Sequence, residues 1–227
     1  MVGILFAILV SIGIPLALFT YAVVNKQLGP FLLGLATFVF SQMFFRIPIL
    51  QLLTVYSPAY TMFSATNPVV FSILLALSAA LVEEVGRYIA MRFLLKKPSW
   101  TSGVLFGAGH GGIEAIIFVG ITALVLLFSA DSGMYGLDYF IGGIERLFAI
   151  LLHIGLSLLV LRSVKERRIS LLFLAIFLHT FVNSLVGIVP IYVRGEMSLV
   201  MIELSLAIIA LGLFIYQLIL KRKGLFT

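Results

Sequence analysis

The sequence predicts an all-α, polytopic integral membrane protein, a bundle of about seven transmembrane helices. Its 227 residues are 62% hydrophobic and 11% charged, whereas soluble domains are about half apolar and about one quarter charged. The mean hydropathy is +1.23. The chain contains no cysteine, which excludes disulfides and thiolate metal sites. These observations favour a protein that is embedded in the lipid bilayer.

Apolar runs bounded by turn or charge signals predict the individual spans. Their bounds are about 3–24, 31–53, 67–95, 101–129, 140–163, 170–188 and 198–220. The fourth run contains Gly107, Gly109, Gly111 and Gly112, and we expect a helix break there because glycines weaken a helix and let backbones approach closely. We find no repeat or linker, so residues 1–227 are expected to form one membrane domain, with a motif-bearing core at about 67–190.

Basic residues are distributed unequally between the two sides of the predicted bundle. The segments that follow spans one, three, five and seven contain Lys26, Lys96, Lys97, Lys165, Arg167, Arg168, Lys221, Arg222 and Lys223, whereas the alternate loops 54–66, 130–139 and 189–197 contain only Arg194. The positive-inside rule therefore predicts that the N-terminus is outside and the C-terminus is inside. The formal charge of +6 then reflects cytoplasmic loops and indicates no nucleic-acid partner. The expected location is a prokaryotic plasma membrane.

Ionisable residues lie inside four of the predicted spans. The three histidines of the chain are His110, His153 and His179, and each has a polar residue four positions later, as does Glu83. Residues at i and i+4 share a helix face. Each group also lies nine residues from the cytoplasmic end of its span, roughly 13 Å at 1.5 Å per residue.

This common depth predicts a shared polar chamber between spans three and six, toward the cytoplasmic half of the bilayer. An ionisable group that faces lipid costs about 2.5–3.5 kcal/mol, so the groups are expected to face one another. The alternative is a purely structural role, since a membrane histidine often serves as an interhelical hydrogen-bond partner. Gln42 and Arg46, next to Pro48, are interpreted as packing or kink residues. Glu203 is interpreted as interfacial.

A carboxylate, imidazoles and a carboxamide in one chamber suit hydrolysis. A glutamate can take a proton from water, and a histidine can hold that water. Histidine and asparagine donors can stabilise the oxyanion that forms when water adds to a peptide carbonyl. The sequence contains no GxSxG or HExxH motif and no reactive cysteine, so the usual signatures of serine, zincin-type and cysteine hydrolases are missing.

Three motifs resemble those of the CAAX-protease and bacteriocin-processing (CPBP) superfamily: EEVGR at 83–87, FGAGH at 106–110 and HTFVN at 179–183. The longer strings EEVGRY, GHGGIEAI and ERLFAILLHIGLS resemble its YhfC branch, named as glutamic-type intramembrane proteases. The resemblance implies a conical polar cavity and peptide-bond hydrolysis within the membrane. In one departure, Arg87 follows Glu84 by three residues, whereas prenyl-protease relatives usually have one residue more.

The resemblance also implies roles for individual residues. Glu83 would be the general base, His110 would position the water, and His179 with Asn183 would stabilise the oxyanion. Glu84 and Arg87 would orient the site. The supporting residues that belong to the YhfC-like strings are Glu114, Glu145 and His153. The expected partners are a membrane-associated peptide or protein substrate and the lipid bilayer, and the residues specify no oligomeric state.

The chemistry leaves several alternatives. A metal-free mechanism is favoured because no local HExxH-type pair exists, although Glu83, His110 and His179 could together hold Zn²⁺. Glu145 and Arg146 either pair with neighbours or line an entry path. A proton-coupled transporter would also place carboxylates and histidines in the membrane, but it predicts inverted repeats. A non-catalytic membrane scaffold or immunity factor is the third alternative.

Overall fold

The computed structural model describes residues 1–129 and 136–224, and this part of the chain is helical without any strand. It contains seven helices that are long and apolar enough to cross a membrane, which confirms the predicted fold class. Each overlaps one predicted span. The observed bounds are Val2–Val24, Leu28–Tyr56, Pro68–Phe93, Trp100–Leu127, Gly136–Lys165, Ile169–Tyr192 and Glu196–Arg222.

Three of the seven spans contain a π-helical segment. Their elements are α1 (Val2–Ile8), η1 (Leu9–Gly13) and α2 (Ile14–Val24); α3 (Leu28–Phe38), η2 (Val39–Arg46) and α4 (Ile47–Tyr56); and α7 (Trp100–Ala115), η3 (Ile116–Gly120) and α8 (Ile121–Leu127). Pro15 and Pro48 are each the second residue after the end of a π segment. Because proline has no N–H to donate to the fourth preceding residue, it favours this change of hydrogen-bond pattern.

The other four spans are single α-helices, and one further helix joins two of the spans. The uninterrupted spans are α6 (Pro68–Phe93), α9 (Gly136–Lys165), α10 (Ile169–Tyr192) and α11 (Glu196–Arg222). The connecting helix is α5 (Pro58–Thr66), which begins after Ser57, whose side chain accepts a hydrogen bond from the Tyr60 N–H. Sequence analysis placed 54–66 in a loop, and the nine residues of α5 are indeed too few to span a membrane.

The predicted break at the glycines of the fourth span is wrong. Helix α7 runs continuously through Gly107–Gly112, and the irregular segment η3 begins only at Ile116. The glycines instead permit close helix packing. A Cβ atom at Gly107 would lie 2.5 Å from the Ile154 Cα of α9, and one at Gly109 would overlap the Phe31 carbonyl oxygen of α3. Small residues serve this purpose in membrane bundles, where helices gain stability from tight packing.

Replacement of Gly109 by alanine is therefore expected to destabilise the protein by about 1–3 kcal/mol, because backbone atoms cannot yield to the added methyl group. Thermal unfolding in detergent measures this effect. Gly142 of α9 provides the control, since a Cβ atom there meets nothing within 4 Å. Gly142→Ala should leave stability unchanged or raise it by up to about 1 kcal/mol. Equal stabilities of the two variants would contradict the close crossing of α3 and α7.

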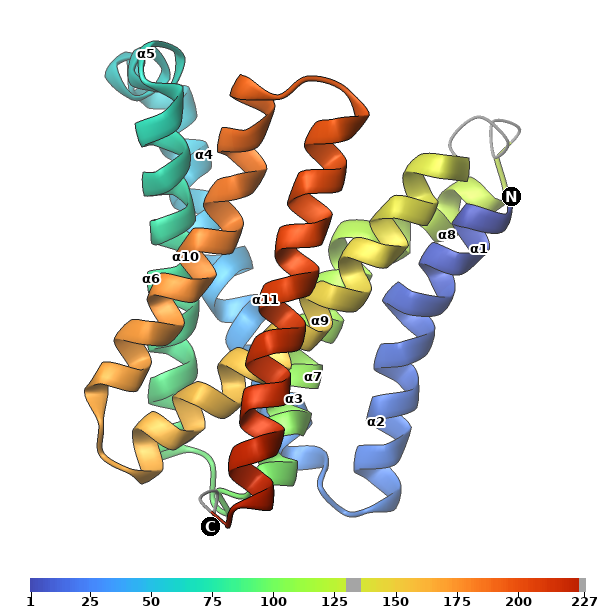
Figure 1. Ribbon diagram of the computed structural model, residues 1–227, viewed down its shortest axis with the longest axis vertical. Coiled ribbons are helices and arrows are strands. Elements are labelled where there is room, and N and C mark those ends of the chain that lie inside the picture. Colours follow the sequence, from blue (N-terminus) through green and yellow to red (C-terminus); the bar gives the residue numbers. More distant parts are fainter. Residues whose placement is uncertain (130–135, 225–227) are drawn as a thin grey trace.

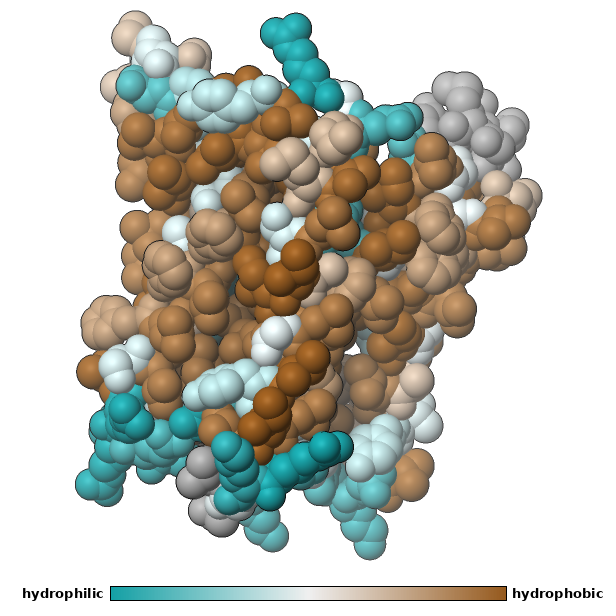
Figure 2. All heavy atoms as spheres, viewed as in Figure 1, coloured by the Kyte–Doolittle hydropathy of each residue, from teal (hydrophilic) through white to brown (hydrophobic). Residues whose placement is uncertain are grey.

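Helix α9 is the central helix of the bundle. In its most apolar stretch 78% of the residues are buried, against 22–33% in the other six spans. It runs obliquely behind α11, from the end of the bundle that holds the N-terminus toward the end that holds the C-terminus (Figure 1). Hydrophilic side chains gather at the two ends of the molecule, with an apolar belt between them (Figure 2). This arrangement places the polar residues of α9 inside the bundle.

Candidate active site

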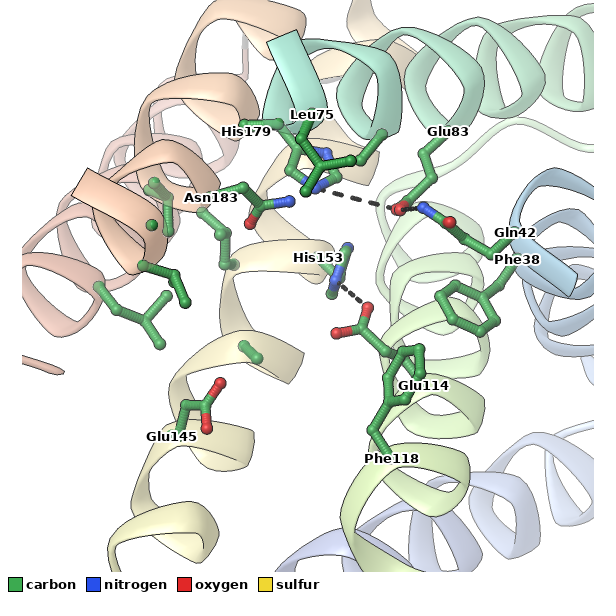
Figure 3. Close-up of a pocket in the computed structure, with 18 of the residues that line it drawn as sticks. Phe38, Gln42, Leu75, Glu83, Glu114, Phe118, Glu145, His153, His179 and Asn183 are labelled. Carbon is green, nitrogen blue, oxygen red and sulfur yellow. Dashed lines mark hydrogen bonds and ion pairs between the residues drawn. The ribbon is translucent and has the colours of Figure 1, made fainter. Parts of the chain in front are cut away.

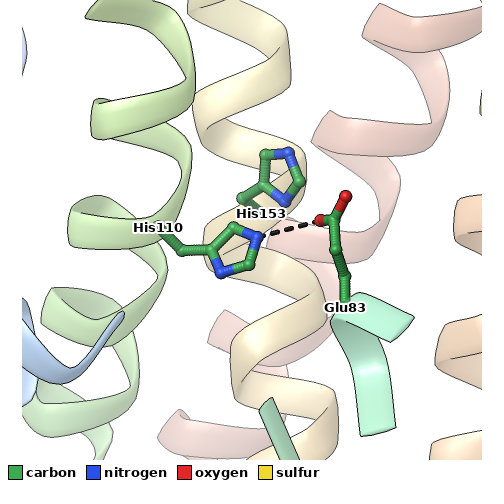
Figure 4. Close-up of side chains that lie close together, drawn as sticks. All are labelled: Glu83, His110 and His153. Atoms are coloured by element: carbon green, nitrogen blue, oxygen red, sulfur yellow. Dashed lines mark hydrogen bonds and ion pairs between the residues drawn. The ribbon is translucent and has the colours of Figure 1, made fainter. Parts of the chain in front are cut away.

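The Glu83 side chain of α6 is the meeting point of the buried polar groups. It is only 3% exposed. Its Oε1 accepts a hydrogen bond from Gln42 Nε2, and its Oε2 lies 2.9 Å from His110 Nε2 of α7 (Figure 4). His179 Nε2 of α10 faces the same Oε2 at 4.0 Å (Figure 3). Side chains from three other spans thus converge on one carboxylate.

Gln42 reaches Glu83 from the π-helical segment η2. Its Oε1 accepts a hydrogen bond from Arg46 Nη1 at 3.1 Å. Arg46 also donates to the Leu75 carbonyl at 2.8 Å and to Ser78 Oγ at 3.0 Å, both on α6. These contacts correct the interpretation of Gln42 and Arg46 as packing or kink residues. Their polar i, i+4 pairing within an apolar span is the sequence signal that could have identified them.

Glu84 fixes the orientation of His179. The His179 Nδ1 atom lies 2.8 Å from Glu84 Oε1. Because a carboxylate only accepts hydrogen bonds, Nδ1 carries the hydrogen, and in the neutral ring Nε2 keeps a lone pair directed at Glu83. Arg87 lies between the two carboxylates, with Nη1 3.4 Å from Glu84 Oε2 and Nη2 3.9 Å from Glu83 Oε2. Its guanidinium balances part of their negative charge.

His153 of α9 is held on both sides of its ring. Its Nδ1 accepts from Arg87 Nη2 at 3.2 Å, because a guanidinium only donates, and its Nε2 lies 2.6 Å from Glu114 Oε2 (Figure 3). Glu114 Oε1 in turn accepts from Arg146 Nη1 at 2.8 Å, and Arg146 also donates to Glu145. A continuous polar network therefore leads from Arg87 to Glu145 along α9.

A cavity of about 390 Å³ adjoins this network. Glu83, His153, His179 and Asn183 are among its lining residues, and the Asn183 amide points into it (Figure 3). Seven of the nine predicted site residues are linked by contacts around Glu83, and Asn183 lines the same cavity. Glu145 also lines the cavity, but it lies apart from Glu83 and forms an ion pair with Arg146. Arg146, for which pairing or an entry-path position was expected, pairs with Glu114 and Glu145 and also lines the cavity. The Phe38 ring, 5.3 Å from the His110 ring, is a neighbour that sequence analysis did not name.

One group of donors in the described residues has the spacing for a metal ion, and it differs from the predicted one. Donor atoms of Glu83, His110 and His153 all lie within 4.8 Å of one another (Figure 4). The predicted set had His179 in place of His153. The central position of α9 accounts for the difference, since the His153 ring lies 4.9 Å from the His110 ring. Two imidazoles and one carboxylate form a common ligand set of catalytic zinc.

The sequence is similar to known membrane proteins over most of its length. A family model described as YhfC intramembrane metalloprotease matches residues 6–136 and 126–206. The chain is 36% identical over 191 residues to the uncharacterized membrane protein YhfC of Bacillus subtilis (strain 168), covering 70% of this chain and 71% of that protein. No solved structure matches the chain significantly.

Proposed function

Because the chain belongs to the YhfC intramembrane metalloprotease family, we propose that it is an intramembrane endopeptidase that cleaves a membrane-associated peptide or protein. The observation that carries this proposal is the environment of Glu83. Its carboxylate is buried among two imidazoles and a carboxamide, yet it lines a cavity of about 390 Å³. A base must lie within hydrogen-bonding reach of a bound water, and Oε2 between His110 and His179 offers that place.

In the proposed reaction Glu83 accepts a proton from water while the water oxygen bonds to the scissile carbonyl carbon. His110 holds the Glu83 carboxylate through its 2.9 Å contact, and the proposal places the water beside this pair. The Asn183 amide donates to the oxyanion, and His179 joins it when both of its ring nitrogens carry a proton. The carbon–nitrogen bond then breaks as the leaving amine takes the proton from Glu83.

The residues fit a divalent metal ion in donor type, in burial and in spacing. Glu83, His110 and His153 would hold it, and a Zn²⁺ ion bound there would polarise the substrate carbonyl. The position of Arg87 favours the glutamic-type, metal-free form of the mechanism. Its permanently charged guanidinium lies 3.2 Å from His153 Nδ1 and 3.9 Å from Glu83 Oε2, where it would repel a dication.

Profiling of new protein N-termini tests the proposed activity even before a substrate has been identified. Membranes that contain the wild-type chain should accumulate cleaved termini that are missing from membranes with Glu83→Gln. Identical profiles would contradict a peptidase and favour the transporter or scaffold alternatives. The purified protein should contain less than one equivalent of metal and should keep its activity with a chelator. Loss of activity that added Zn²⁺ restores would instead assign Glu83, His110 and His153 as ligands.

Gln42→Leu is expected to lower kcat/KM by about 10- to 100-fold, the usual effect of removing a side chain that orients a catalytic group. The reason is that Glu83 Oε1 and Arg46 Nη1 each lose a partner. Gln51→Leu, at an exposed position of α4, is the control and should act like the wild type. Cleavage of an identified substrate by the purified variants measures the difference. Equal rates for the two variants would remove Gln42 from the site.

A further inference from the structure

The cavity extends from Glu83 in only one direction along the bundle. On α6 its lining residues precede Glu83 in the sequence, on α9 they end at His153, and on α10 they begin at His179. The lining runs from Ser72 to Glu83 on α6, from Glu145 to His153 on α9 and from His179 to Gly187 on α10. Helices α6 and α9 begin, and α10 ends, at the end of the bundle that holds the N-terminus (Figure 1). The cavity therefore extends from Glu83 toward that end.

The opposite side of Glu83 is filled by tightly packed side chains. On α9 the turns after His153 contain Leu156, Leu158, Leu159, Val160 and Leu161, all with 0% exposure. Met91 of α6 and Phe106 of α7 pack in the same core, at 2% and 0%. This half also contains a second pocket, lined by Tyr88, Arg92, Val164, Arg167 and Ile169, which shares no lining residue with the cavity at Glu83. Because a close-packed interior has few voids larger than a water molecule, the packed core separates the two.

Charge identifies the side of the membrane to which each end belongs. The filled half leads to the end with Lys96, Lys97, Arg167, Arg168, Lys221 and Arg222. The positive-inside rule assigns these residues to the cytoplasm. The open end holds α5 and the segment between α10 and α11, in which Arg194 is the only basic residue. The cavity therefore faces away from the cytoplasm.

We infer that the site receives its substrate from the extracytoplasmic side, as an extended apolar peptide segment. This inference rests on the proposed function and on the charge-based orientation. A volume of about 390 Å³ is near the lower end of the about 300–1,000 Å³ of small-ligand pockets, so it admits a few extended residues and excludes a folded domain. Leu75, Val186 and Ile202 line the route and suit apolar side chains.

The absence of cysteine from the chain permits a direct test with single-cysteine variants. Ala149→Cys and Ser157→Cys form a matched pair, each four residues from His153 on the same face of α9 but in opposite directions. Ala149 lines the cavity, whereas Ser157 has 0% exposure in the packed half. A membrane-impermeant maleimide should label Ala149→Cys in intact cells and leave it unlabelled in inverted vesicles. Ser157→Cys should react only after denaturation.

Two exposed positions establish the orientation in the same experiment. Ala65→Cys in α5 should react in intact cells, and Lys97→Cys after α6 should react in inverted vesicles. Labelling of Ala149→Cys only in inverted vesicles, labelling from neither side, or a reversed pattern of the two markers would each overturn the inference. The labelling needs no peptidase activity, so its outcome is independent of the N-terminal profiles that test the proposed function.

Discussion

Replacing Glu83 by glutamine is expected to lower kcat by about 10²- to 10⁴-fold, the range that general-base catalysis contributes. Glutamine has nearly the same shape, so the Gln42 and His110 side chains keep a neighbour at the same place. What the variant loses is the oxygen that takes a proton from water. Its thermal stability in detergent should therefore stay close to that of the wild type. Cleavage kinetics with a substrate identified by N-terminal profiling measure the change.

Glu196→Gln, at an exposed position at the start of α11, should leave cleavage unchanged and controls for loss of a carboxylate as such. Retention of wild-type activity by Glu83→Gln would contradict the assignment of the base. In that event Glu114 would be the next candidate, because its Oε2 faces His153 at 2.6 Å and it lines the same cavity. The Glu114→Gln variant would then be expected to lose cleavage activity.

Replacing Arg87 by methionine is expected to destabilise the fold by about 3–5 kcal/mol, the typical result when one member of a buried ionic group is removed. Arg87 has 0% exposure and lies between Glu83 and Glu84. Without the guanidinium, two buried carboxylates repel each other, and His153 Nδ1 loses its donor. Thermal or chemical unfolding in detergent gives the size of the effect. Arg92→Met, at an exposed position on the same helix, is the matched control.

A double variant separates charge balance from loss of packing. Glu84→Gln combined with Arg87→Met removes one negative and one positive charge, so it should recover part of the stability that Arg87→Met alone loses. The pair coupling should be about 0.5–3 kcal/mol for residues in direct contact. If the two changes were simply additive, the 3.4 Å contact between Arg87 and Glu84 would contribute nothing to folding.

The spans and the convergence of the polar groups were open to prediction because both depend on local patterns. Hydropathy over about 20 residues identifies a membrane helix without reference to its neighbours. Equal spacing from the helix ends then brings groups on different helices to one level, and Glu83, His110, His153 and His179 do meet. The orientation of the bundle, the membrane in which it resides and the roles of these residues remain predictions.

The features that sequence analysis missed depend on irregular or tertiary geometry. Gln42 donates to Glu83 from within the π-helical segment η2, and hydropathy contains no signal for a π segment. His153 joins His110 because α9 crosses the bundle obliquely, an angle that side-chain packing determines. The glycines of α7 were interpreted as a helix break. The sequence alone does not distinguish a glycine that weakens a helix from one that lets a neighbouring helix pack closely.

The π-helical segment η2 makes the site sensitive to chain length. Deleting a single residue between Val39 and Arg46 would let this wide turn close into an α-helical one, because a π segment holds one residue more than the α-helical turn that it replaces. The residues within the turn, Gln42 among them, would then point in new directions. Among homologues, a one-residue gap at this position therefore marks a change in the chemical group that meets the Glu83 carboxylate, even where every motif residue is retained.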